Sequence, residues 1–73
     1  MAATRVTYHV TPFGSGWQVA AEGRDVDVVR DNKEAALAEA KRLAKDEPLG
    51  QVIVHGEDGR IQEEFTYGSD IPG

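Results

Sequence analysis

The apolar residues of this chain follow two different periods, and this change of period restricts the fold more than any single motif does. Within residues 6–30 and 51–67, apolar and polar side chains alternate in short runs, as in half-buried strands. Residues 32–46 between them contain no Gly or Pro, and their apolar side chains recur at helical spacing. Strand segments on both sides of one helix predict a sheet that is covered by that helix.

Three short strands are expected before the helix. Val6, Tyr8 and Val10 alternate with polar residues as far as Pro12, which cannot donate a hydrogen bond to a neighbouring strand. The turn residues 13–16 join this run to a second strand that begins at Trp17, so the two form a hairpin. A third, shorter strand is predicted over 26–30.

The helix is expected to begin at Asp31, because an acceptor side chain followed three positions later by Glu34 resembles a capping box. Pro48 and Gly50 end it. Residues 51–55 and 61–67 then form the last two strands, joined by an Asp-Gly turn. The predicted fold is α+β, with the order β-β-β-α-β-β: a five-stranded twisted, mixed sheet with one helix packed on one face. Glu63, which shares the apolar face of the last strand, marks that strand as an edge.

The predicted core consists of the side chains whose parity or helical position turns them inward. These are Val6, Tyr8, Val10, Trp17, Val19, Val28, Leu37, Ala40, Leu43, Ala44, Val52, Val54, Ile61 and Phe65.

The length of 73 residues predicts one domain, 1–73, ordered over about 4–67 with a tail at 68–73. The chain has no cysteine, so no disulfide can stabilise this small core. No apolar run approaches the about 20 residues of a membrane span, and the first residues lack the apolar stretch of a signal peptide. We therefore expect a cytoplasmic protein that does not enter a membrane.

The formal charge of −5 disfavours a general phosphate-binding surface. Helix bases Lys33, Lys41, Arg42 and Lys45 leave a nucleic-acid-associated module as an alternative, although acids are mixed among them. Catalysis is not expected, because neither serine has a histidine partner nearby in the sequence and the paired acids suit a solvated surface. No cofactor is expected, since Gly14-Ser15-Gly16 is too short for a phosphate loop.

The sheet face away from the helix is the expected site of function. Parity places these residues there: Thr7, His9, Gln18, Ala20, Ile53, His55, Gln62, Glu64 and Thr66. Of these, His9, Ile53, His55, Gln18 and Glu64 are the candidate binding residues. No metal ligand is assigned, but a small metal or ligand carrier using His9 and His55, with Glu64 as a carboxylate, is a second alternative.

Four signatures occur in order along the chain: Tyr8-His9-Val10-Thr11-Pro12, Gly16-Trp17, residues 54–61 (Val-His-Gly-Glu-Asp-Gly-Arg-Ile) and Tyr67-Gly68. Together they resemble a small bacterial domain family of unknown function. The chain departs from it in having Glu57 and the run Ala20-Ala21-Glu22 where such domains often carry basic residues. The resemblance implies the fold and no catalytic residue.

The leading hypothesis is a non-catalytic binding or interaction domain, acting through its open sheet face or an edge strand. The partner is an unknown protein or a second copy of the chain. An interface that includes the two histidines is expected to weaken as the pH falls through about 6.5, where imidazole titrates.

Overall fold

The computed structural model describes residues 5–67, and its elements follow the predicted order. The tail predicted at 68–73 and the expected start of order at Thr4 lie outside the described residues. The elements are β1 (Val6–Phe13), β2 (Gly16–Ala21), β3 (Asp27–Arg30), α1 (Lys33–Lys45), β4 (Gly50–His55) and β5 (Ile61–Tyr67). This confirms the predicted α+β fold.

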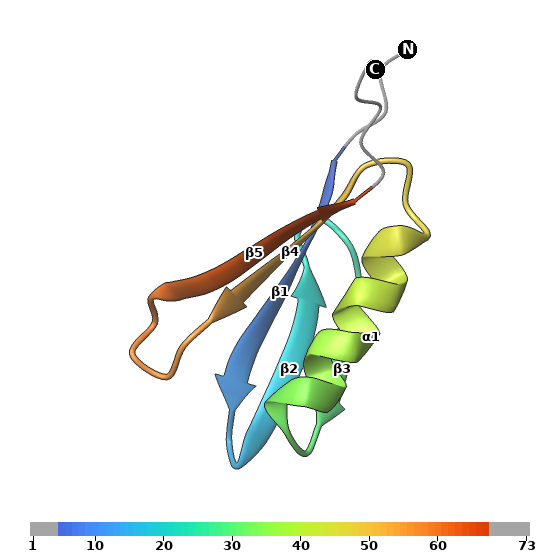
Figure 1. Cartoon of the computed structure of the whole chain (residues 1–73). Coiled ribbons are helices and arrows are strands. Elements are labelled where there is room, and N and C mark those ends of the chain that lie inside the picture. The colour runs from blue at the N-terminus through green and yellow to red at the C-terminus, as the bar shows by residue number, and fades with distance from the viewer. Residues whose placement is uncertain (1–4, 68–73) are drawn as a thin grey trace.

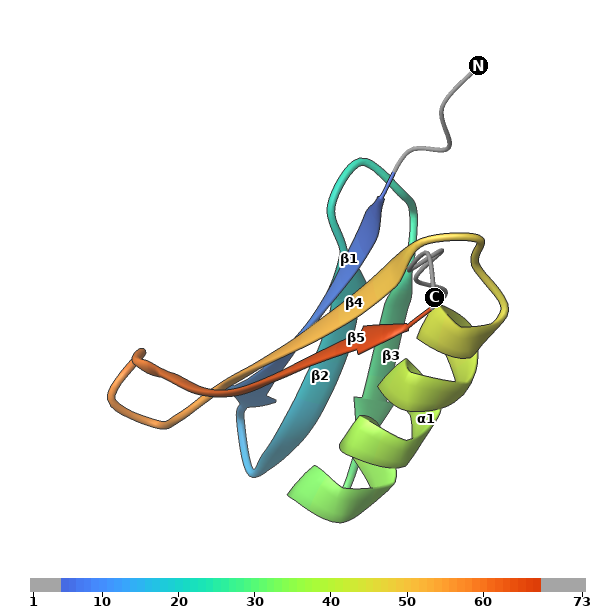
Figure 2. The same cartoon turned by 45° about the horizontal axis from the view of Figure 1, so that its top comes forward.

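The five strands form one mixed sheet in the order β3-β2-β1-β4-β5. The β1–β2, β2–β3 and β4–β5 pairs are antiparallel, whereas β1 and β4 in the centre are parallel. Helix α1 makes the crossover from β3 to β4 and packs on one face of the sheet (Figure 1). Seen from a second angle, α1 is again on that side, and no described element covers the other face (Figure 2). Among the described residues, no helix is long and apolar enough to cross a membrane.

The helix approaches the sheet closely because its inward side chains are small. Ala36, Ala40 and Ala44 are fully buried. They pack with the largest fully buried side chains, which are the strand valines Val10, Val19, Val52 and Val54. At the end of the helix, Gly50 lies so close to α1 that an added Cβ would be 2.1 Å from the carbonyl oxygen of Ala44. Small residues thus set the spacing between the two layers.

The helix begins one residue later than the sequence suggests. The N-cap is Asn32, whose Oδ1 accepts a hydrogen bond from the Ala35 backbone N–H at 2.8 Å. The predicted capping box of Asp31 and Glu34 is therefore wrong. Both side chains at 31 and 32 can cap a helix, and propensity does not distinguish them. The helix ends at Lys45, with Asp46 as the C-cap.

The core differs from the prediction at its C-terminal hairpin. Val54 pairs with Glu63, but His55 pairs with Ile61, so Gln62 is the extra residue of a β-bulge. The bulge reverses the parity of the strand beyond it. Ile61, predicted in the core, therefore shares a face with His55 and is 54% exposed. Gln62, predicted on the open face, instead accepts a hydrogen bond from Lys33 of α1.

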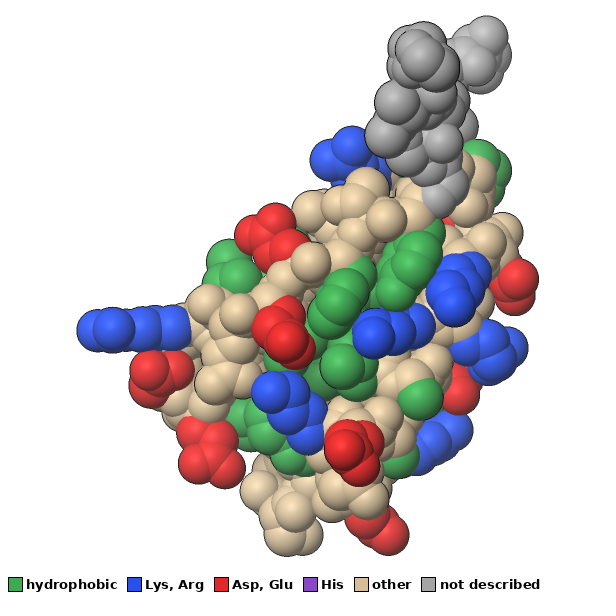
Figure 3. Space-filling model, in the orientation of Figure 1, with side chains coloured by type: hydrophobic (Ala, Val, Ile, Leu, Met, Phe, Trp, Pro, Cys, Tyr) green, Lys and Arg blue, Asp and Glu red, His purple; other side chains and the backbone are tan. Residues whose placement is uncertain are grey.

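Three aromatic side chains on the helix side lie at its margin, whereas Tyr8 is buried in the core. Trp17, Phe65 and Tyr67 pack against the core but remain partly exposed. The ammonium groups of Lys33, Lys41 and Lys45 lie 5.9, 4.2 and 5.6 Å from the centres of these three rings, in that order. Figure 3 shows a strip of apolar side chains between β5 and α1 with basic side chains beside it. The lysines thus cover the aromatic edge of the core.

Candidate functional site

The open face of the sheet consists of parallel rows of side chains that cross the strands. The central row runs from Asp27 on β3 through Ala20, His9 and Ile53 to Glu64 on β5, because these residues pair in register. Neighbouring residues in such a row lie side by side on the same face. The structure therefore brings three of the five candidate binding residues into one line.

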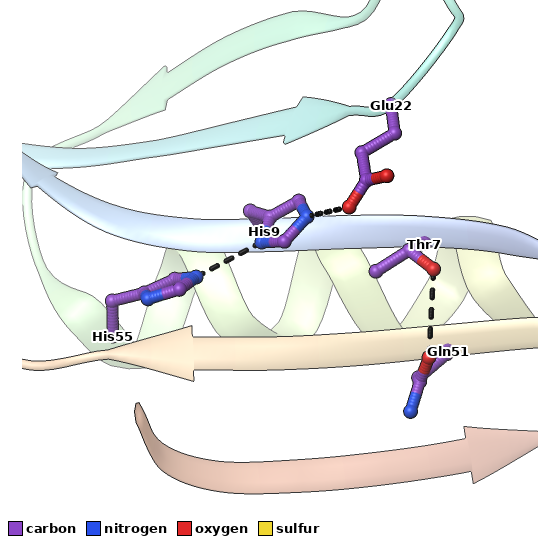
Figure 4. A network of polar contacts seen from close by, with 5 residues as sticks. All are labelled: Thr7, His9, Glu22, Gln51 and His55. Carbon is purple, nitrogen blue, oxygen red and sulfur yellow. Dashed lines mark hydrogen bonds and ion pairs between the residues drawn. The ribbon is translucent and has the colours of Figure 1, made fainter. Parts of the chain in front are cut away.

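The two histidines meet at the centre of this face. His9 Nδ1 on β1 lies 2.9 Å from His55 Nε2 on β4, and the ring planes differ by 26° (Figure 4). The ring centres are 5.1 Å apart, a separation that fits two rings meeting edge to edge through one N–H···N hydrogen bond. This contact joins residues that are 46 positions apart in the chain.

The second nitrogen of His9 has its own partner. His9 Nε2 lies 2.5 Å from Oε2 of Glu22, just beyond β2. Because a carboxylate accepts, this nitrogen donates. In the neutral ring, Nδ1 of His9 then accepts the hydrogen bond from His55 Nε2–H. Sequence reasoning named Glu64 as the carboxylate near the imidazoles and missed Glu22, although Glu22 has the parity of Ala20 and could have been placed by the hairpin register.

Two further pairs of polar side chains lie on the open face. Thr7 Oγ1 donates to Gln51 Oε1 at 3.4 Å, across the same β1–β4 junction as the imidazole pair. Gln18 Nε2 donates to Asp27 Oδ1 at 2.7 Å, across β2 and β3. Gln18 is thus on the predicted face but bonds to the edge strand and not to the histidines.

Apolar side chains surround this polar centre. Phe13, Val29 and Ile61 are the large hydrophobic residues of the described chain that are most exposed, at 53%, 47% and 54%. All three lie on the open face: Val29 pairs with Gln18, Ile61 pairs with His55, and Phe13 has the parity of His9 on β1. Ile53, the apolar residue expected there, is only partly exposed. The apolar character of this face therefore exceeds the prediction.

The charges of this face are acidic. Asp27 and Glu64 end its central row, and Glu22 lies beside His9. Among the described strand positions whose side chains share this face, none is Lys or Arg. The helix bases are on the opposite side of the sheet, where Arg42 contacts Glu39 and the three lysines lie over aromatic rings.

A different polar link closes the helix side near the end of α1. The Tyr8 hydroxyl donates to Glu47 Oε2 at 3.0 Å, and Arg24 donates to the same oxygen at 2.9 Å. Burial of the phenol raises the pKa of Tyr8, and the bond to the Glu47 carboxylate raises it further. This link stabilises the fold, because it ties the β2–β3 connection to the residues after α1.

Residues 5–67 contain a hollow away from the open face and no group of three metal-binding side chains. A hollow of about 420 Å³ opens on the helix side, between Trp17, Lys33 and the β4–β5 turn. Within the described residues, no three His, Cys, Asp or Glu side chains are grouped so that they could together hold a metal ion. The open face remains the surface with the most specific arrangement of side chains.

Comparison with known proteins shows the family of this chain. Residues 8–67 match the model of a family described as "Uncharacterized protein conserved in bacteria (DUF2188)". The chain belongs to this family. It is also 39% identical over 62 residues to the "Uncharacterized protein YdaT" of Bacillus subtilis (strain 168), an alignment that covers 84% of this chain and 41% of YdaT. The chain thus spans about two fifths of the length of that relative. No solved structure matches it.

The match to DUF2188 includes both histidines of the open face, since it extends from the residue before His9 to the end of β5. It confirms the resemblance drawn from the motifs. Neither the family description nor the name of YdaT assigns an activity, so the function has to be argued from the side chains of this chain.

Proposed function

We propose that this DUF2188 chain is a non-catalytic, cytoplasmic protein-interaction domain, and that its open sheet face binds a partner segment carrying apolar and basic side chains. One observation carries the proposal: the three most exposed large hydrophobic residues of the described chain all lie on the sheet face that has no helix. Val29 and Ile61 lie on the two edge strands, so the apolar side chains are spread across the whole face. Several exposed apolar side chains on one uncovered face favour association with another protein.

Charge decides which partner chemistry fits this face. Its carboxylates Glu22, Asp27 and Glu64 are not matched by Lys or Arg on the described strand positions of the same face. Complementary potentials favour a basic partner and oppose a second copy of the same acidic face. They oppose a nucleic-acid backbone for the same reason. The helix bases give less support to a nucleic-acid module than their number suggests, because the lysines lie over Trp17, Phe65 and Tyr67.

Site-specific photo-crosslinking in the cells that make the protein tests this proposal. A benzophenone side chain at Thr66, exposed on the open face, should capture a partner, and one at Ala38, exposed on α1, should not. Glu64→Lys should reduce the crosslink from Thr66 at least tenfold, because it places a cation opposite a basic segment. The matched charge reversal on the helix, Glu34→Lys, should leave it unchanged.

Three outcomes would overturn the proposal. Capture mainly from Ala38 would place the interface on the helix. Equal effects of Glu64→Lys and Glu34→Lys would remove the charge complementarity. A crosslinked product that contains only this chain would mean that the face binds a second copy.

A further inference from the structure

The imidazole pair has a geometry that the interaction function does not need. Two basic nitrogens, one from each of the central parallel strands, face each other at 2.9 Å on an uncovered surface. Two imidazole nitrogens bound at about 2.0–2.1 Å to one metal ion lie about 2.9–3.4 Å apart when they occupy neighbouring coordination positions. The backbone therefore already holds the two rings at the spacing that a shared ion requires.

We propose that His9 Nδ1 and His55 Nε2 bind one divalent transition-metal ion of the kind that prefers imidazole, with Cu²⁺ bound most tightly. The ion takes the place between the two nitrogens, the proton on His55 Nε2 moves to Nδ1 of the same ring so that His55 stays neutral, and each ring turns so that both lone pairs point at the ion. The His9 side chain is 25% exposed, so it has room for this turn. Cu²⁺ ranks above Ni²⁺ and Zn²⁺ at nitrogen sites according to the general order of metal affinities.

The contact with Glu22 supports this assignment independently. Metal-binding histidines usually donate their second ring N–H to a carboxylate, which fixes the tautomer and makes the ligating nitrogen more basic. His9 Nε2 lies 2.5 Å from Glu22 Oε2, so Nδ1 is the nitrogen of His9 that carries the lone pair. This is the tautomer that coordination through Nδ1 needs.

The site supplies two protein ligands and no more, because no third His, Cys, Asp or Glu in the described part of the chain completes a metal-binding group with them. Water fills the remaining positions, since the open face is uncovered. The expected complex is therefore exchangeable and of moderate affinity, unlike a closed structural zinc site. Because each imidazole must be neutral to bind the ion, protons compete with the metal, and affinity should fall as the pH falls.

The first test uses the wild-type chain with CuCl₂ alone, in a buffer that does not coordinate copper. Paramagnetic broadening of amide signals should centre on His9 and His55 at substoichiometric metal, and electron paramagnetic resonance should show coupling to imidazole nitrogen. Broadening that begins instead at the acidic turn around Glu57 and Asp58, or at the chain N-terminus, would overturn the proposal without any mutation.

The second test compares matched variants by calorimetric titration. His9→Gln and His55→Gln should each weaken Cu²⁺ binding at least tenfold. Glu22→Gln should weaken Cu²⁺ binding about tenfold, because it removes the carboxylate that accepts the hydrogen bond from His9 Nε2. Asp27→Asn removes the same charge from the same face without touching His9, and should change affinity less than twofold.

Equal losses in Glu22→Gln and Asp27→Asn would mean that the carboxylates only attract the cation, and would refute the assigned role of Glu22. Wild-type affinity in both histidine variants would refute the site itself. Circular dichroism of each variant checks that it remains folded, and the wild-type broadening pattern decides the question if either histidine variant unfolds.

Discussion

Gly50 is the position where one added methyl group should have the largest effect. It begins β4, pairs with Val6 on one side and Tyr67 on the other, and is buried. A Cβ at this position would lie 2.1 Å from the Ala44 carbonyl oxygen, 2.8 Å from its carbonyl carbon and 2.9 Å from its Cα. All three atoms belong to the helix backbone, which cannot turn aside as a flexible side chain could.

The loss of stability in Gly50→Ala depends on which part of the backbone moves to relieve the clash. Either the end of α1 withdraws from the sheet, which loosens the packing of Ala44, or β4 shifts and strains its pairing with two neighbours. Overpacking a core costs about 1–3 kcal/mol, and a backbone clash lies at the upper end of that range. We therefore expect Gly50→Ala to lower the free energy of unfolding by about 3 kcal/mol. A 73-residue domain has about 4–11 kcal/mol in total at about 0.05–0.15 kcal/mol per residue.

Urea unfolding followed by circular dichroism measures this loss. A domain of this size should also melt about 12–24 °C lower, at roughly 4–8 °C per kcal/mol. The control is Gly14→Ala, in a turn with φ of 61° where an added Cβ has no atom within 4 Å. Its cost should be only about 1 kcal/mol, from backbone conformation alone. If Gly50→Ala were no worse than Gly14→Ala, the close helix–sheet spacing would be wrong.

Three further predictions concern separate parts of the molecule. Trp17→Ala should lower the free energy of unfolding by about 3 kcal/mol, the low end for a large aromatic, because the ring is only partly buried; an unchanged thermal melt would contradict its packing. Gly59→Val should cost about 1–2 kcal/mol because φ is 84°, whereas Glu57→Lys on the exposed turn should change stability by less than about 0.5 kcal/mol; similar losses would mean a different turn. The raised pKa of Tyr8, caused first by burial, means that the folded chain keeps the phenol proton to higher pH than the unfolded chain does, so its contribution is full below pH 10.0 and is lost as the pH rises further. Tyr8→Phe should therefore flatten the alkaline loss of stability, and an unchanged alkaline loss in that variant would contradict this.

The element order could be predicted from the sequence because each element has a strong local signal. Alternation marks the strands, and a stretch without Gly or Pro marks the helix. The mixed sheet can also be predicted from the order of the elements, because a helix that runs back over the sheet makes the next strand parallel to an earlier one. The two predictions that were wrong, the N-cap and the parity at the start of β5, depend on tertiary contacts that local sequence patterns do not contain. The choice between Asp31 and Asn32 as the N-cap depends on where the helix meets the sheet, and the bulge at Gln62 depends on pairing with β4.

The sequence predicted which candidate residues lie on the open face, but not which of their side chains contact one another. Parity placed His9, Ile53, His55 and Glu64 correctly, whereas the contact between the imidazoles requires β1 and β4 to be neighbours, which the sequence leaves open. The bulge then moved Ile61 onto this face, which alternation had assigned to the core.

The imidazole pair bridges β1 and β4, so a ligand bound to it should affect the stability of the sheet. Parallel pairing is slightly weaker per residue than antiparallel pairing, and β1–β4 is the parallel junction that joins the N-terminal three strands to the C-terminal hairpin. Two open-face side-chain bonds cross it, Thr7 with Gln51 and His9 with His55. The unfolded chain separates these partners by more than forty residues, so a ligand that contacts both imidazoles binds the folded state alone. Such a ligand adds RT ln(1 + [L]/Kd) to the free energy of unfolding. Occupancy of the imidazole pair should therefore stabilise the parallel β1–β4 junction.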